Sequence, residues 1–360
     1  MDDRSTRLAE PHDAADASAV VKFPDLYLEI SVRTMIEKPE GEIRRGDLRG
    51  ATRLNSRWGN ITNLEGIQYC LDLIEIRLIG SDIVSDVTHL ASLPNVKTLS
   101  LSKTPTLDIT PLTRMTDLQT LSLHRVEALD ISTLATFPAL KTLRLSGDCM
   151  PDLTPLAGLA TLQNLHLQFD QLGDIASLES LTNLKSLEIE RSLLRELIMA
   201  KPSSIEPLPK MSSIERLASL TNLESLCLAD YKLGDLAPLA SLNNLQNLVL
   251  RNNQLGDLAP LASLTNLDTL DLSGNQIGDL APLASLTNLD YLDLAGNQLS
   301  DIAPLANLTK LEMLDLSSNQ LGDLAPLASL TNLDTLDLAH NQIGDLAPLA
   351  SLTNLDTLDL

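Results

Sequence analysis

The strongest constraint on this chain is a 22-residue repeat that can be followed from residue 51 to residue 360. The segments 267–277 and 333–343 are close copies of each other. Fourteen repeats align by their first apolar residue, and eleven of the thirteen intervals are 22 residues, one is 23 and one is 39. Self-similarity at this period predicts a stack of thin coils, each of which packs only against its neighbours.

Each repeat reads L-x-x-L-x-L-x-x-N-x-L/I-x-D-L-x-P-L-A-x-L-x-x. The L-x-L step has a period of two, which predicts a short strand with its apolar residues pointing inward. An Asp followed three residues later by Pro, as in Asp279 and Pro282, favours a capped helical turn. Few residues remain to close each coil, so we expect 3₁₀ or single-turn helices there. The predicted fold is an α/β solenoid, a curved right-handed superhelix with a parallel β-sheet on its concave side.

An asparagine recurs in the turn after each predicted strand of the last repeats. Its amide can both donate to and accept from main-chain groups, so we interpret these residues as a structural ladder that satisfies the turns. In earlier repeats the position changes to other residues, for example Asp148 and Tyr231. The ladder consists of Asn253, Asn275, Asn297, Asn319 and Asn341.

Composition excludes several classes of function. The net charge of −22 argues against binding nucleic acid or an anionic membrane, both of which require a basic surface. No apolar stretch approaches the ~18 residues of a membrane span, and the first twenty residues lack the apolar core of a secretory signal. Three widely spaced cysteines suit neither a disulfide framework nor a zinc site, which predicts a reducing, cytoplasmic compartment. We expect no cofactor and no metal.

The repeats resemble those of bacterial internalin-like leucine-rich-repeat proteins, whose 22-residue units end in I-x-D-L-x-P-L. The resemblance covers about residues 21–360 and extends to the front of the chain. There, Phe23-Pro24-Asp25-Leu26 opens a predicted amphipathic helix that runs to about Glu37, and the segment 61–69 matches the family's I-x-x-[LI]-x-G-[IVL]-x-[YF] pattern. The resemblance implies a helical N-terminal cap and protein recognition on the concave sheet.

These patterns predict three regions: a disordered tail at 1–20, a helical cap at 21–50, and a solenoid of about fourteen repeats at 51–360. The 39-residue interval places an inserted loop at about 198–215. Insertions in solenoids map to loops on one face, often the binding face. The alternative is that the insertion records a damaged repeat.

The residues that alternate with the buried ones should face solvent on the concave side. In the first repeats they include cations and the few aromatic residues, which dominate protein-binding hot spots. Our predicted partner-binding residues are Arg53, Arg57, Trp58, Arg77, His124, Arg125, Arg144, His166, Phe169 and Tyr291. The alternative is that they are scattered surface residues of repeats that have drifted.

The later repeats place an aspartate at the fifth position of five successive coils. This column could bind Ca²⁺, attract a basic partner, or be a solvated face copied by duplication. It consists of Asp271, Asp293, Asp315, Asp337 and Asp359.

The sequence predicts a non-enzymatic protein-binding module. No phosphate-binding, metalloprotease or nucleophile-elbow motif occurs. Cys227 lies beside Glu188, whose negative charge should raise the thiol pKa. His166 lies one strand beyond Glu188 in the same column, too far from Cys227 to activate the thiol directly. An alternative is the recognition arm of a larger enzyme, for example a GTPase with upstream leucine-rich repeats, truncated at residue 360. A secreted virulence factor is a third reading. The partner is a protein, and we also expect self-association through an uncapped C-terminal end.

Overall fold

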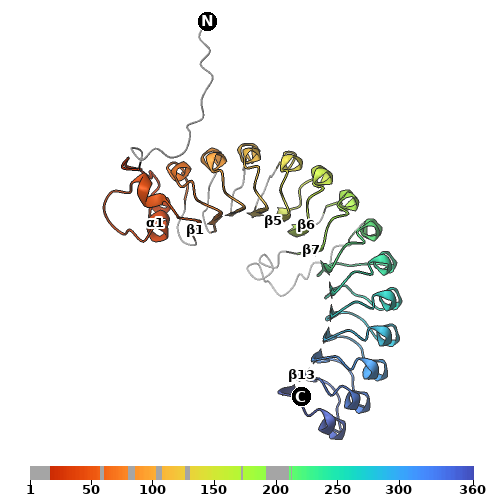
Figure 1. The fold of residues 1–360 in the computed structure, drawn as a ribbon. Helices are drawn as coiled ribbons and strands as arrows, with labels where there is room; N and C mark the ends of the chain where they lie inside the picture. The colour runs from red at the N-terminus through yellow and green to blue at the C-terminus, as the bar shows by residue number, and fades with distance from the viewer. Residues whose placement is uncertain are drawn as a thin grey trace, which may run out of the picture. The chain divides into compact units, whose positions relative to one another are not determined.

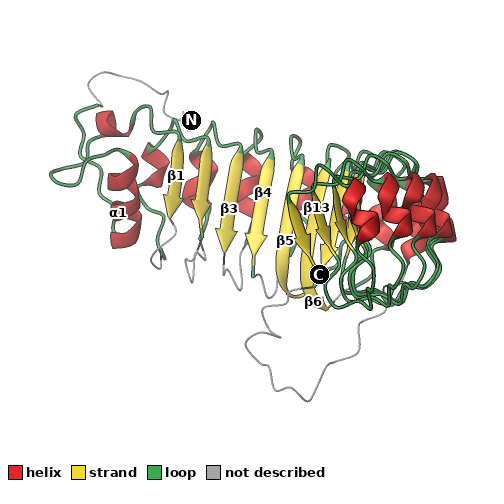
Figure 2. Ribbon diagram, turned by 90° about the horizontal axis from the view of Figure 1, so that it is seen from below, coloured by secondary structure: helices red, strands yellow, loops and turns green. Residues whose placement is uncertain are grey.

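The chain builds stacks of short coils in two compact units, Met1–Leu140 and Lys141–Leu360. The computed structural model describes residues 17–56, 61–79, 86–102, 108–125, 130–171, 173–191, 211 and 213–360. In each unit the strands line one face, which we call the strand face, and 3₁₀ turns line the opposite face (Figures 1 and 2). These features confirm the predicted leucine-rich-repeat solenoid.

The first unit opens with the helix α1 (Leu26–Met35), which packs Leu28 and Val32 into the core. Its coils follow, and their strands pair in parallel in chain order. The strands are β1 (Arg53–Ser56), β2 (Glu75–Leu78), β3 (Thr98–Ser102) and β4 (Thr120–His124). The 3₁₀ turns are η2 (Arg45–Leu48), η3 (Ile67–Tyr69), η4 (Thr88–Ser92), η5 (Thr110–Arg114) and η6 (Leu134–Thr136).

Asp25 fixes the start of α1. Its Oδ1 accepts hydrogen bonds of 3.0 Å from the backbone N–H of Tyr27 and of Leu28. Its Oδ2 accepts from the backbone N–H of Thr62 at 2.7 Å and of Asn63 at 3.2 Å. One carboxylate therefore caps the helix and ties it to the segment that leads into the repeats. Burial disfavours the charge, but these hydrogen bonds outweigh it and hold the pKa of Asp25 below its usual value.

The described residues of the second unit continue the pattern with ten parallel strands in chain order. They are β5 (Thr142–Cys149), β6 (Asn164–Gln171), β7 (Ser186–Glu190), β8 (Ser225–Leu228), β9 (Asn247–Val249), β10 (Thr269–Asp271), β11 (Tyr291–Asp293), β12 (Met313–Asp315), β13 (Thr335–Asp337) and β14 (Thr357–Asp359). The 3₁₀ turns are η7 (Thr154–Gly158), η8 (Ala176–Ser180), η9 (Ile214–Ser219), η10 (Ala237–Ser241), η11 (Ala259–Ser263), η12 (Ala281–Ser285), η13 (Ala303–Asn307), η14 (Ala325–Ser329) and η15 (Ala347–Ser351).

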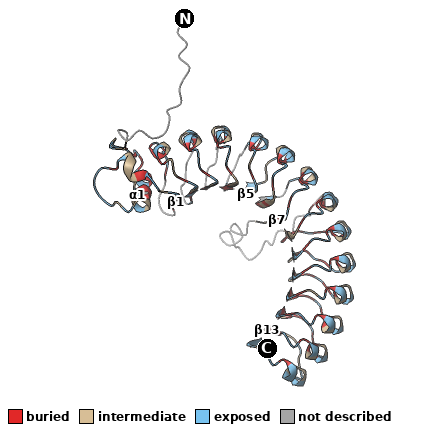
Figure 3. Cartoon of the chain, in the orientation of Figure 1, coloured by how far each residue is buried: buried red, intermediate tan, exposed pale blue. Residues whose placement is uncertain are grey.

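Leucine fills the space between the strand face and the turns. In the coil that contains β10, Leu267, Leu270 and Leu272 are all fully buried, and the same positions are buried in most other coils (Figure 3). Asp279, which lies just before the N-cap Leu280, accepts a 2.8 Å hydrogen bond from the backbone N–H of Ala281, the first residue of η12, and so helps to fix the start of that turn. Thin coils with one leucine layer need no aromatic bulk, which accounts for the 2% aromatic content.

The asparagine ladder bonds each coil to the one before it. The Asn275 amide donates to the carbonyls of Leu272 at 2.8 Å, within its own coil, and of Leu250 at 3.1 Å, in the preceding coil. Its Oδ1 accepts from the backbone N–H of Asn253 at 2.9 Å and of Leu255 at 3.0 Å. The side chain therefore satisfies main-chain groups that would otherwise be buried without partners.

Candidate functional site

The strand face of the second unit carries one continuous column of side chains. The strand register brings the fifth residue of each coil opposite the fifth residue of the next. In order, the column contains Arg144, His166, Glu188, Cys227, Val249, Asp271, Asp293, Asp315, Asp337 and Asp359. Its character therefore changes from mixed charge to uniformly acidic along the stack.

The first part of this column belongs to a network that we call the charged cluster. His166 Nδ1 contacts Glu188 Oε2, and Arg251 Nη2 lies 2.9 Å from Glu190 Oε1. The hydrogen bond from His166 lowers the pKa of Glu188, with a smaller contribution from the nearby arginines, so this carboxylate stays charged. The charged cluster consists of Arg144, His166, Glu188, Glu190, Cys227 and Arg251.

Cys227 does not have the surroundings of a nucleophile. Its Sγ lies 3.4 Å from Glu190 Oε1. Burial raises the thiol pKa, and the charges of Glu190 and Glu188 raise it further, so the thiol stays protonated. The direction agrees with the expectation from sequence, although the carboxylate in direct contact is Glu190 rather than Glu188.

The second part of the column, Asp271, Asp293, Asp315, Asp337 and Asp359, is the aspartate column. Asp293 Oδ1 accepts a 2.9 Å hydrogen bond from the backbone N–H of Ala295. Burial, and then repulsion from Asp271, Asp315 and Asp337, raise the pKa of Asp293 to about 6. Within the described part of the chain, no three His, Cys, Asp or Glu residues are grouped so that they could hold a metal ion.

Tyr291 lies two residues before Asp293 on the strand β11, and therefore on the same side of that strand. It starts β11, is half-buried, and pairs in register with Thr269 on one side and Met313 on the other. Burial raises the pKa of its hydroxyl, and the neighbouring aspartates raise it further. The Met313 side chain is 43% exposed, so an aromatic ring and a thioether border the acidic surface.

The predicted binding residues of the first unit are partly engaged with one another. Glu75 Oε1 lies 2.5 Å from Arg77 Nε, and its Oε2 lies 3.5 Å from Arg53 Nε. Both arginines are exposed, so these pairs contribute little stability and leave the guanidinium groups accessible. His124 is half-buried and Arg125 is exposed, and both have interactions within the protein. Arg57 and Trp58 lie outside the described residues, as does most of the inserted segment at 198–215.

The expectation that Phe169 faces solvent is wrong, because its side chain is only 1% exposed. In several other coils the residue at the eighth position has a positive φ and leaves the strand, as at Arg125, with φ 55°. The strand β6 is longer and continues through Phe169 to Gln171. Period-two alternation then puts Phe169 on the same inward side as Leu165 and Leu167.

The ion pair between Glu190 and Arg251 was not predicted as a site. The two residues are 61 positions apart in the sequence, but they occupy equivalent places in their coils. The intervening coil has Ala229 at this position, and a small residue leaves room for the two long side chains to meet. The signal was therefore present in the sequence as a glutamate, an alanine and an arginine in one column.

Comparison with known proteins agrees with this architecture. The profile described as "Leucine Rich repeats (2 copies)" matches residues 243–285, 287–329 and 331–360. The structure of an internalin, InlF, from Listeria monocytogenes is 32% identical, with a TM-score of 0.76, over 94% of this chain and 96% of that chain. The Leptospira interrogans leucine-rich-repeat protein LIC12759 is 22% identical, with a TM-score of 0.60, over 96% and 97% of the two chains.

The functional domain of InlJ from Listeria monocytogenes is 19% identical, with a TM-score of 0.61, over 94% of this chain and 75% of that one. At these lower identities, LIC12759 and InlJ support the fold alone. No curated protein matches the sequence. Among the described residues, no helix combines the length and the apolar character needed to cross a bilayer.

Proposed function

Because this chain belongs to the internalin-like family of leucine-rich-repeat proteins, we propose that it binds a partner protein on its concave strand face and is not an enzyme. Solenoids of this kind present extended surfaces, and a row of coils offers a large contact area without a deep pocket. The candidate contacts for the partner are the charged cluster within the second unit and, as a separate patch within the first unit, Arg53 and Arg77.

The observation that carries this proposal is the charged cluster. It spans the strands β5 to β9, and its ion pairs are held in place by the strand register. Arg144 is exposed at the edge of the cluster and lies near Glu188. Arg251, paired with Glu190 and only partly exposed, is pre-ordered, and arginine in such a setting is a common anchor of protein interfaces. An acidic or mixed-charge partner surface complements it.

The absence of catalysis is part of the proposal, and the state of Cys227 supports it. This thiol shares the column with His166, with Glu188 between them in register, and its raised pKa keeps it uncharged at neutral pH. The cysteines Cys70, Cys149 and Cys227 are all free, which supports a reducing, cytoplasmic location. Cell fractionation followed by immunoblotting tests this location, and recovery from the culture medium would contradict it.

The binding proposal is tested by affinity capture from the native lysate with quantitative mass spectrometry. The variants Arg77→Glu and Arg144→Glu each reverse one charge on the strand face. The matched controls Arg114→Glu and Arg216→Glu reverse exposed charges on η5 and η9, on the opposite face. We expect a partner whose recovery falls at least about tenfold with a strand-face variant, as for loss of an interface anchor, and stays constant with the controls. Equal recovery with all four variants refutes the proposal.

A further inference from the structure

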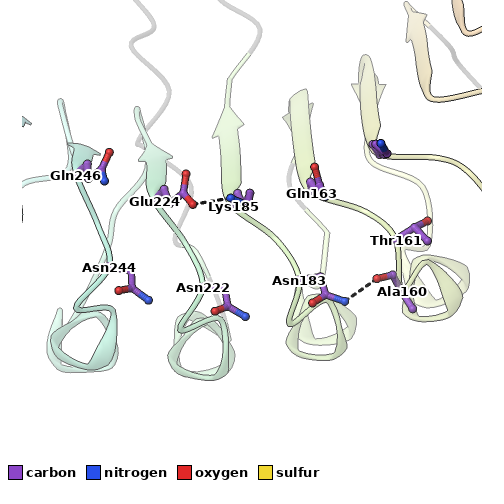
Figure 4. Close-up of a pocket in the computed structure, with 10 residues that line it drawn as sticks. Ala160, Thr161, Gln163, Asn183, Lys185, Asn222, Glu224, Asn244 and Gln246 are labelled. Carbon is purple, nitrogen blue, oxygen red and sulfur yellow. Dashed lines mark hydrogen bonds and ion pairs between the residues drawn. The ribbon is translucent and has the colours of Figure 1, made fainter.

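A second surface of the second unit lies on its flank, where each 3₁₀ turn leads into the next strand. Two rows of polar side chains border a groove with a volume of about 650 Å³ that crosses five successive coils (Figure 4). We call it the flank groove. Its volume lies within the range of ligand sites, and it is separate from the charged cluster because its residues precede the strands.

The lower row is a set of asparagines with fixed orientation. Asn183 donates to the carbonyl of Ala160 at 2.7 Å, Asn222 to that of Thr182 at 2.8 Å, and Asn244 to that of Thr221 at 2.9 Å. A primary amide has two N–H groups and one acceptor oxygen. Each asparagine therefore keeps a donor and an acceptor for a ligand, while the bond to the preceding coil removes most of its rotational freedom.

The upper row contributes two further side-chain amides and three charged residues, Lys141, Lys185 and Glu224. The side-chain amides of Gln163 and Gln246 have no hydrogen-bond partner within the described residues, and Gln246 is exposed. In the middle of the row, Lys185 Nζ pairs with Glu224 Oε1 at 2.7 Å. Lys141 stands at one end with no carboxylate partner among the described residues, so that end of the groove is positive.

This lining suits an extended polypeptide. The peptide groups of an extended segment need donors and acceptors from outside, and side-chain amides supply both. The groove has no aromatic side chain against which a sugar ring could pack, and its one apolar side chain, Ala160, is too small to receive the hydrophobic face of a helix. With coils about 4.8 Å apart, five coils span roughly 19 Å, which accommodates about six extended residues.

We propose that the flank groove binds an extended peptide segment of about six residues, with an acidic side chain at the Lys141 end. This site acts independently of the strand face, so its failure in an experiment would leave the proposed concave-face function untouched. The free amides of Gln163 and Gln246 align the peptide backbone, and Lys141 sets its direction by charge.

The test uses the full chain and a phage-displayed library of random twelve-residue peptides as the probe. Enriched peptides are synthesised, and their affinities are measured by fluorescence anisotropy. We expect the double variant Gln163→Ala/Gln246→Ala to weaken binding by about tenfold, as for the loss of two hydrogen bonds. Lys141→Glu should weaken it by a similar factor, and the enriched peptides should carry Asp or Glu near one end.

The matched control is Gln276→Ala/Gln298→Ala, which removes two exposed amides outside the groove and should change affinity less than about twofold. Circular dichroism establishes that each variant is folded. The proposal is overturned if no peptide is enriched, if the enriched peptides bind the groove variants as tightly as the native chain, or if only Arg144→Glu abolishes binding. A glycan array on which the native chain binds and the double variant does not would also overturn it.

Discussion

Replacing Asp293 by Asn should stabilise the protein at neutral pH and have little effect at pH 4. Asp293 lies between Asp271 and Asp315 on adjacent strands, and strands are spaced about 4.8 Å apart. At the dielectric constant of water, each neighbour at that distance repels by roughly 0.9 kcal/mol. The pKa of Asp293 rises from 3.8 to about 6, an increase that corresponds to an upper bound of about 3 kcal/mol. Solvent screening reduces the expected gain to about 1–2 kcal/mol.

The pH dependence follows from the direction of this shift. The folded state holds the proton of Asp293 up to about pH 6, whereas the unfolded state loses it near 3.8. Stability therefore falls as the pH rises from about 4 to about 6, and the Asn variant should lack this loss. Asn also retains the acceptor oxygen that bonds the N–H of Ala295.

Urea unfolding followed by circular dichroism at pH 4 and pH 7 provides the measurement. The control Asp290→Asn removes an exposed carboxylate from the same coil but outside the aspartate column. A gain of equal size at both pH values, or an equal gain from the control, would refute the reasoning. The gain at pH 7 should also shrink in 1 M salt, where charges are screened within about 3 Å.

Three further perturbations address the fold. Asp25→Ala should cost about 2 kcal/mol at pH 7, because it removes a helix cap and the bonds to residues 62 and 63. Since the pKa of Asp25 is lowered, this cost should shrink as the pH falls below about 3.8, which urea titrations at pH 7 and pH 2.5 will measure. Asn297→Ala should lower the free energy of unfolding, measured in urea, by about 2–4 kcal/mol, because the buried carbonyls of Leu272 and Leu294 lose their donor. The control Asn332→Ala, at an exposed asparagine, should lower it by less than about 1 kcal/mol. Gly66→Ala should lower the melting temperature, because Gly66 has φ 101° and a Cβ there would lie 2.6 Å from the Phe23 ring. The control Gly234→Ala should not lower it, because there is open space around Gly234.

The sequence predicted the repeat, the strand positions and an aspartate bonded at the start of each later turn, although the N-cap itself is the next residue, because these features depend on local spacing. Asp279, Pro282 and the leucines of each coil act within a few residues of one another, so the pattern in one repeat indicates the structure of that repeat. The helix at the front was expected from Phe23 to Glu37, and α1 spans Leu26–Met35. Its start is set by Asp25, whose bonds to residues 62 and 63 could not be read from the local pattern.

The candidate site was less predictable because strand length varies between coils. Phe169 was expected on the strand face, and the extension of β6 buries it instead. The contact between Glu190 and Arg251 requires knowing that Ala229 lies between them in register and is small. The flank asparagines, among them Asn183 and Asn222, recur before every strand from β7 to β14 except β12, but their bonds to the preceding coil emerge only from the stacking geometry.

The asparagine ladder has an evolutionary consequence. Asn275, Asn297 and Asn319 each present the same bonds to the coil before and offer the same acceptor to its main chain. A coil gained or lost by recombination between such copies therefore joins two surfaces that already fit, and no new interface has to evolve. Each added coil also extends the aspartate column by one residue, so the length and the negative charge of this face grow by one strand and one carboxylate for each repeat that the gene gains.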